Sequence, residues 1–260
     1  MNKDKFQLSK WYLDSIDQKG NVFIGYMALL KWKKASIHFC NHLFYDVEKG
    51  IKSYISIQKC RFPELINNTL NWKTKHVNAS WHGIDKAISE KILESEHGNI
   101  EWDCLQPKAN SDILLRNDQR HTGLGYTERI DISIKPWEIP INKLYWGRFL
   151  SGTDTIIWID WHGESQKKIL YHNGIKKDDL QIFEEKINFE DHEILISQSV
   201  ILRKGSLIST IFSKFKWFIK VFPSSILNTE ECKWRSYGIL KKNNIVLSEG
   251  WIIHEVVRWG

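Results

Sequence analysis

Short apolar runs separated by turn residues recur along the whole chain, and this rhythm restricts the fold more than any other feature of the sequence. Such runs, rich in Ile, Val and aromatic residues and bounded by Gly, Asn or Asp, are typical of β-strands. No strand–helix alternation runs through the chain, which argues against Rossmann and TIM-barrel folds. We expect strands over residues 22–30, 35–46, 51–60, 98–105, 111–116, 125–134, 143–150, 155–162, 168–173, 193–203, 206–210, 233–241 and 244–259.

Two segments break the strand pattern. Residues 84–95 place apolar side chains at helical spacing, so we expect a short helix there. Residues 207–222 place them three and four residues apart, up to Pro223. This spacing predicts a strand followed by an amphipathic helix, which either packs on the β structure or covers a ligand entrance. The predicted fold is therefore all-β with one or two short helices.

The chain divides most naturally near its middle. The turn-rich stretch 118–125 (DQRHTGLG) lies roughly halfway along, and no Pro-, Gly- or Ser-rich linker competes with it. We therefore expect an N-terminal β unit over residues 1–120 and a C-terminal β unit over residues 121–260.

Tryptophan is unusually frequent, with 13 residues beside 12 Phe and 8 Tyr. Aromatic side chains favour strands, and they also line apolar ligand cavities. Two interpretations stay open, an aromatic packed core and a cavity for an apolar ligand. An apolar fraction of 42% with 26% charged residues excludes a wholly disordered chain.

The formal net charge of +6 raises the question of nucleic-acid binding. The lysines are spread along the chain beside expected turns, and no arginine stripe is present, so we expect no nucleic-acid partner. The four cysteines are widely scattered and are typical of reduced core residues. The N-terminus lacks a signal-peptide pattern and no apolar run has the length of a membrane helix, so we expect a cytoplasmic protein.

Motifs for nucleotides, catalytic metals and hydrolase nucleophiles are missing from the sequence, including G-x-G-x-x-G, H-E-x-x-H and G-x-S-x-G. The histidines show no spacing typical of a metal site. We therefore expect no cofactor and no metal. Only His162 and His254 fall at strand positions that make them candidates for testing.

Alternate residues of a strand share one face, and this places carboxylates beside apolar side chains. Tyr126 and Glu128 share a face with three isoleucines of the same run. In the last expected strand, Glu255 lies on the face of Trp251 and Trp259. Both glutamates are thus expected on buried faces.

The two expected strands between them carry similar combinations. Arg148 shares a face with Trp146. In the following strand Trp158 and Asp160 share a face, while Trp161 takes the other. An ionisable side chain and an indole therefore recur together on successive strands.

Burying a carboxylate is unfavourable by several kcal/mol unless it is paired or its pKa rises until it is neutral. One interpretation is that Arg148 forms a buried ion pair with Glu128 or Glu255. The other is that one carboxyl stays protonated in a dry aromatic cavity and donates its proton to an alkene or carbonyl, while indoles stabilise the developing cation. The residues alone leave both open.

Four short stretches carry a resemblance: Gly125-Tyr126-Thr127-Glu128, Pro136-Trp137, Trp146-Gly147-Arg148 and Trp158-Ile159-Asp160-Trp161. Their succession resembles the central region of lipocalin-like carotenoid 1,2-hydratases (hydroxyneurosporene synthases), within the superfamily that includes AttH-like and Diels–Alderase-type proteins. The resemblance implies two packed lipocalin-like (calycin) β-barrel units. It also implies a cofactor-independent reaction, either water addition to an isoprenoid double bond or cyclisation.

The resulting hypothesis is an enzyme that acts on an apolar isoprenoid or polyketide-like molecule by proton-initiated cyclisation, isomerisation or hydration. Glu128 would be the acid, with Glu255 or Asp160 as the alternative, Arg148 would tune or anchor, and Tyr126 would relay a proton. A substrate derived from a membrane would bring peripheral membrane contact. The alternative is a non-catalytic carrier of a hydrophobic ligand or pigment. Five tryptophans would shape the cavity: Trp146, Trp158, Trp161, Trp251 and Trp259.

Overall fold

The computed structural model describes residues 5–56, 60–116, 118–164, 166–183, 185–206 and 228–260. Nearly all regular structure in these ranges is antiparallel β-sheet, and a single 3-10 turn, Pro136–Glu138, is the one helical element among them. None of the described segments forms a helix with the length and apolarity needed to cross a membrane. The expectation of an all-β fold is confirmed.

The chain separates into two compact units, residues 1–135 and 136–260. We expected the division at 120/121, but the structure places it after Lys135. The reason is that the turn-rich stretch 118–125 is the connection between two paired strands of the first unit and the start of the second of them. A turn inside a hairpin and a turn between units have the same composition, so the sequence does not distinguish them.

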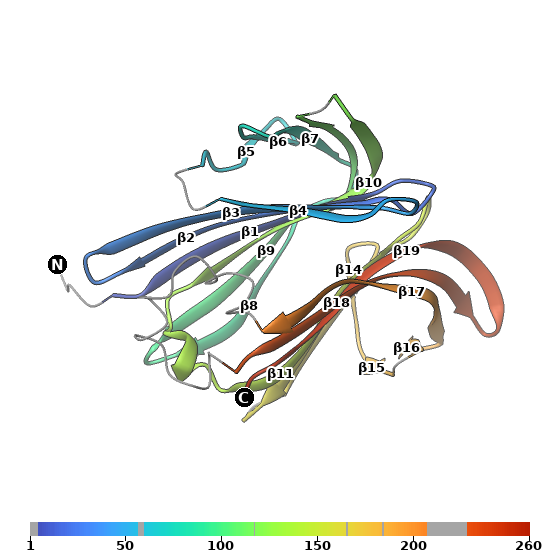
Figure 1. Ribbon diagram of the computed structural model, residues 1–260. Coiled ribbons are helices and arrows are strands. Elements are labelled where there is room, and N and C mark those ends of the chain that lie inside the picture. Colours follow the sequence, from blue (N-terminus) through green and yellow to red (C-terminus); the bar gives the residue numbers. More distant parts are fainter. Residues whose placement is uncertain (1–4, 57–59, 117, 165, 184, 207–227) are drawn as a thin grey trace. The chain divides into compact units, whose positions relative to one another are not determined.

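Unit 1 is a ten-stranded sheet in the order β4-β3-β2-β1-β10-β9-β7-β6-β5, with β8 paired to β9. Figure 1 shows that this sheet curls, so that the β5–β7 end arches over β2 and β3. The strands are β1 (Gln7–Ile16), β2 (Val22–Trp32), β3 (Ala35–Asp46), β4 (Gly50–Ser56), β5 (Glu64–Ile66), β6 (Thr69–Lys73), β7 (Val77–Gly83), β8 (Ile88–Ser95), β9 (Gly98–Leu115) and β10 (Arg120–Ile132).

The concave face of unit 1 holds an apolar core. Gly25 on β2 makes the curl tight, because a Cβ there would lie 2.6 Å from the Trp72 ring of β6. Trp72 is fully buried and packs among residues from both ends of the sheet. The core consists of Trp11, Leu13, Phe23, Met27, Cys40, Phe44, Leu70, Trp72, Val77, Ala79, Trp81, Ala109, Ile113 and Leu115.

Unit 2 repeats the plan with a nine-stranded sheet in the order β14-β13-β12-β11-β19-β18-β17-β16-β15. Its strands are β11 (Ile141–Leu150), β12 (Thr155–Gly163), β13 (Lys167–His172), β14 (Ile175–Lys177), β15 (Gln181–Ile182), β16 (Lys186–Phe189), β17 (His192–Ser206), β18 (Glu230–Lys242) and β19 (Ile245–Arg258). One face packs a core of Phe149, Ile156, Trp158, Leu170, Leu180, Ile187, Phe189, Ile194, Leu240 and Ile252.

The helix expected over residues 84–95 is wrong, because residues 88–95 form strand β8. Strand β9 is 18 residues long, and β7 pairs only with its second half. The first half offers a free edge that β8 fills, with Ile88 opposite Cys104. Backbone pairing with a long neighbour outweighs a weak local helical spacing. The helix expected over 207–222 lies outside the described residues.

Candidate functional site

Glu128 in unit 1 accepts hydrogen bonds from two neutral side chains. The Trp102 indole N–H and the Tyr126 hydroxyl both donate to Glu128 Oε2, each over 2.6 Å. All three side chains are buried, with Glu128 5% exposed. Tyr126 and Glu128 come from β10 and Trp102 from β9. The expected placement of Tyr126 and Glu128 on one buried face is therefore confirmed.

A local irregularity of strand β9 lies beside these groups. The register between β9 and β10 shifts on both sides of Thr127, whereas the register between β10 and β1 is regular. Bulges of this kind re-aim side chains, and they are common beside functional sites. On the regular side, Tyr12 lies opposite Glu128 and Asp14 lies opposite Tyr126, so both join the same face.

Two side chains of the cluster, Tyr126 and Cys104, keep their protons at neutral pH. Burial raises the pKa of the Tyr126 hydroxyl well above its ordinary value, and nearby Cys104 and Glu128 add to the effect. Burial likewise raises the pKa of the Cys104 thiol, and Glu128 and Asp14 raise it further. Phenol and thiol therefore remain protonated beside a carboxyl group, an arrangement that can pass a proton along a chain of side chains.

Sequence reasoning missed Trp102, Cys104 and Asp14 as members of this cluster. Strand 98–105 was expected, and its alternation of Trp102 and Cys104 on one face was the available signal. What the sequence does not show is that β9 is the neighbour of β10 and that Glu128 pairs with Cys104 across the ladder.

A second set of predicted residues lies together on one face of unit 2. Trp146 is opposite Glu255, and Arg148 is opposite Ile253, in the ladder between β11 and β19. Arg148 is fully buried and donates to the backbone carbonyl of Trp251 over 3.1 Å. Glu255 forms an ion pair with Lys233.

Lys233 was not among the predicted residues, although it is 2% exposed and its ammonium lies 5.0 Å from the Trp146 ring centroid. It neutralises Glu255 and makes a cation–π contact at the same time. The expected ion pair of Glu255 thus has Lys233 as a partner. Glu128, the other glutamate in question, belongs to unit 1, whereas Arg148 belongs to unit 2.

Trp158 and Asp160 lie on the opposite face of the same sheet. Trp158 packs in the apolar core of unit 2. Asp160 is 4% exposed, and its Oδ2 contacts His162 Nε2 at 2.9 Å. The His162 ring in turn meets Tyr145 at 5.7 Å. This Asp–His pair is a second ionisable group of unit 2, separated by the sheet from Glu255.

The five tryptophans proposed to shape a cavity do not share one wall. Trp146, Trp161 and Trp251 lie on the Glu255 face of unit 2, because Trp161 is opposite Leu144 in the β11–β12 ladder. Trp158 lies on the other face. Trp259 follows the end of β19, and its backbone N–H donates to the Asn142 carbonyl.

One cross-strand row of unit 2 brings indoles and an imidazole together. Trp158, Gly147, His254 and Trp234 are successive partners across β12, β11, β19 and β18. The Trp234 and His254 rings stack at 5.1 Å. Burial, together with the charge of Lys233, lowers the pKa of His254 to about 4. His254 is therefore neutral at pH 7, hydrogen-bonded to Ser236 Oγ.

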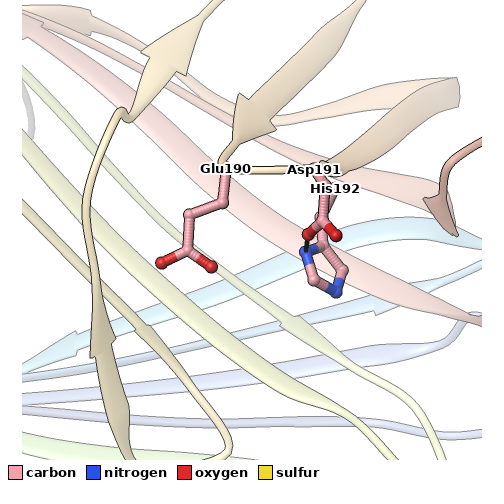
Figure 2. A group of neighbouring side chains, drawn as sticks. All are labelled: Glu190, Asp191 and His192. Atoms are coloured by element: carbon pink, nitrogen blue, oxygen red, sulfur yellow. Dashed lines mark ion pairs between the residues drawn. The ribbon is translucent and has the colours of Figure 1, made fainter.

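Glu190, Asp191 and His192 are a group that could hold a metal ion, as Figure 2 shows. Both carboxylates already have cationic partners, however. Lys177 binds Glu190 at 3.0 Å and Lys242 binds Asp191 at 3.2 Å. The Asp191 carboxylate also contacts His192 Nδ1 at 2.7 Å. Neutralised acidic side chains at a surface turn give no reason to propose a metal here.

Comparison with known proteins places the fold. No family model matches the chain, and no curated protein matches it. Among solved structures, the alignment with CghA in complex with Sch210972 covers 98% of this chain and 89% of CghA, with a TM-score of 0.56 and 9% identity. An AttH-like protein from Nitrosomonas europaea covers 98% and 93%, with a TM-score of 0.58 and 6% identity. Kievitone hydratase from Nectria haematococca covers 96% and 88%, with a TM-score of 0.56 and 8% identity.

The chain has the lipocalin-like fold of these proteins. The match extends over nearly the whole chain, so both β units take part in it. The expected fold is confirmed, and so is the expected likeness to AttH-like and hydratase structures. At identities below 10%, the likeness concerns the fold and leaves the reaction to be argued from side chains.

Proposed function

We propose that this protein is a cofactor-independent enzyme that acts on an apolar small molecule, of isoprenoid or polyketide-like type, by proton-initiated cyclisation, isomerisation or hydration. The single observation that carries the proposal is the donation by both Trp102 and Tyr126 to one oxygen of the buried Glu128. Buried groups with shifted pKa values, such as its neighbours Tyr126 and Cys104, cluster at functional sites. The structural neighbours support the proposal, since one is named a hydratase and another holds a small molecule, Sch210972.

The chemistry needs no redox partner. In a hydration, the acid transfers its proton to one alkene carbon, and water attacks the cationic carbon that results. The proton that water loses then returns to the carboxylate, so that the enzyme ends as it began. In an isomerisation the returned proton comes from a neighbouring carbon of the substrate instead. Glu128 would hold the transferred proton, and Tyr126 would hand it on.

Tyr126 suits a relay role because it is itself protonated and already points its hydroxyl at Glu128. Trp102 fixes the carboxyl from β9 and presents an indole beside it. An indole face stabilises a nearby cation by about 0.5–2 kcal/mol, more when water is excluded. The cluster thus combines a proton source, a relay and a group that tolerates developing positive charge.

The test is turnover in D₂O with a panel of monoterpene and sesquiterpene alkenes, analysed by mass spectrometry. Proton-initiated chemistry places deuterium on a substrate carbon. Glu128→Gln keeps the shape of the side chain and removes its acid proton, so the rate should fall by ~10²- to 10⁴-fold while ligand binding, followed by tryptophan fluorescence, persists.

Glu101→Gln is the matched control, because Glu101 lies on the exposed side of neighbouring β9. It should leave the rate unchanged. A folded wild-type protein that binds these ligands and incorporates no deuterium would identify a carrier rather than an enzyme. A Glu128→Gln variant with full turnover would remove Glu128 from the mechanism.

A further inference from the structure

A cavity of about 150 Å³ opens in unit 1 where segments distant in the sequence meet. Its walls come from β3 and β4, from the turn before β7, and from the connection between β9 and β10. His42 of this cavity is in the row of Leu13 and Thr127, whereas Glu128 is in the alternate row of Tyr12. The cavity therefore opens on the face of the sheet opposite to Glu128 and is independent of the proposed reaction.

Three flat rings form the side of the cavity. The Tyr54 ring lies 4.1 Å from that of His76 and 5.3 Å from that of His42. His42 and Tyr54 are nearly parallel, with 27° between their planes. Phe44 and Leu115 complete an apolar floor that is continuous with the core of the unit. A planar apolar group would find ring faces around it and aliphatic atoms beneath it.

The mouth of the cavity is cationic. Lys52 and Arg116 line it and are both exposed, and none of the described lining residues is acidic. Burial, together with the nearby His76, lowers the pKa of His42 to about 4. Burial, Arg116 and Lys75 likewise lower the pKa of His76. At pH 7 the imidazoles are therefore neutral hydrogen-bonding groups, and the fixed charge of the mouth is that of Lys52 and Arg116.

The backbone ties the cationic and aromatic parts together. The Arg116 N–H donates to the His76 carbonyl over 3.0 Å. The turn that carries His76 is held by Thr74, whose Oγ1 accepts from the backbone N–H groups of His76 and Val77. The backbones of Arg116 and His76 are thus held together without a ligand, which favours preorganised binding.

We propose that this cavity binds a small aromatic carboxylate, with its ring among His42, Tyr54 and His76 and its carboxylate at Lys52 and Arg116. The volume of the cavity fits one aromatic ring, because an apolar cavity of about 150 Å³ accommodates benzene. The charge agrees as well, because guanidinium and ammonium groups are the usual partners of a carboxylate.

The experiment is a titration with benzoate, followed by NMR of the imidazole carbons in the full-length protein. Resonances of His42 and His76 should shift and saturate, with a dissociation constant on the order of 1 mM for so small a ligand. Exposed His97, outside the cavity, should not move. Benzyl alcohol, which keeps the ring and lacks the charge, should bind more weakly.

Arg116→Gln should weaken benzoate binding by about two- to fivefold, the range expected for one exposed ion pair. Arg120→Gln is its control at the start of β10, because Arg120 pairs with Asp112 and does not line the cavity. Tyr54→Ala should reduce the binding of both probes. Equal shifts at His97, equal affinity for benzyl alcohol, or unchanged benzoate binding in folded Arg116→Gln would each overturn the proposal. None of these outcomes depends on the chemistry of Glu128.

Discussion

At the residue scale, hydrogen bonds decide which protons the Glu128 cluster keeps. Tyr126 donates to Glu128, and burial keeps the Tyr126 hydroxyl protonated. Trp102 donates to the same oxygen from the neighbouring strand. The two donors satisfy an oxygen of the buried carboxyl group, and leaving such an oxygen without a hydrogen bond would be unfavourable. The same donors make the cluster sensitive to the loss of either one.

Tyr126→Phe should destabilise the protein by about 1–3 kcal/mol, because it removes a hydrogen-bond donor from a buried carboxyl group. Urea unfolding with a tryptophan fluorescence readout measures this difference. Tyr237→Phe is the control, since Tyr237 makes the same kind of bond to Glu249 on an exposed site. Equal losses in the two variants would show that burial adds nothing to the Tyr126 bond.

The low pKa of His254 predicts a pH dependence of stability. Its folded-state pKa is about 4, below the ordinary value of 6.5, so between these pH values the unfolded chain binds a proton that the folded chain does not. Neutral His254 therefore contributes to the free energy of unfolding above pH 6.5. This contribution, about 3 kcal/mol at most, is lost as the pH falls toward 4. His42, with the same direction and value, acts in parallel.

Unfolding free energies at pH 7 and pH 4.5 test this for wild type and His254→Gln. The decrease in the variant should be smaller than in wild type, by up to about 3 kcal/mol, because the His254 contribution is then absent. A decrease of the same size in both proteins would show that His254 is not the source.

At the element scale, close packing across strands depends on the positions of glycines, which leave room for large neighbours. Gly147 lies between Trp158 and His254 in its row of unit 2, and a Cβ there would meet a Trp158 ring carbon at 2.2 Å and the His254 Cβ at 2.8 Å. Trp158 is 1% exposed within the core and has no room to retreat. The indole therefore covers strand β11 directly.

Gly147→Ala should cost about 1–3 kcal/mol of stability or more, as expected for overpacking a filled core. Thermal unfolding by circular dichroism provides the measurement. Gly152→Ala is the control, because nothing lies within 4 Å of a Cβ there. If Gly147→Ala unfolds at the wild-type temperature, the Trp158 contact is looser than described.

The elements were largely predictable, because strand alternation and turn residues are local properties. Trp146 and Arg148 share a face, as the alternation predicted, and the structure places Glu255 of β19 on that same face. Lys233 and Trp102 were not predicted, for one physical reason. Each contacts a residue of a neighbouring strand, and local sequence does not determine which strands are neighbours. Strand β8 was missed because its pairing with β9 outweighs its own spacing.

At the scale of the whole molecule, two units of similar plan each form one sheet with long-range pairing. In unit 1, Ser9 and Asp131 form a hydrogen bond across 122 positions. Non-local antiparallel pairing of this kind makes folding slow, typically milliseconds to seconds. Across the described residues, regular structure is nearly all strand.

Far-UV circular dichroism should therefore show a strand-dominated spectrum. Thermal melting should abolish it cooperatively within each unit. A helix content near the one-third average of globular proteins would contradict the described architecture.

The position of β1 inside its sheet, paired with β2 on one edge and β10 on the other, has a consequence during translation. A nascent chain can form the β1–β4 meander early, but one edge of β1 stays open until Ile132 has left the ribosomal exit tunnel. Unit 2 behaves in the same way, because β11 can pair with β19 only after the last strand of unit 2 has been synthesised. Each seam is thus closed by the last long strand of its unit, and until then an unpaired edge is exposed to the binding of other strands or of chaperones.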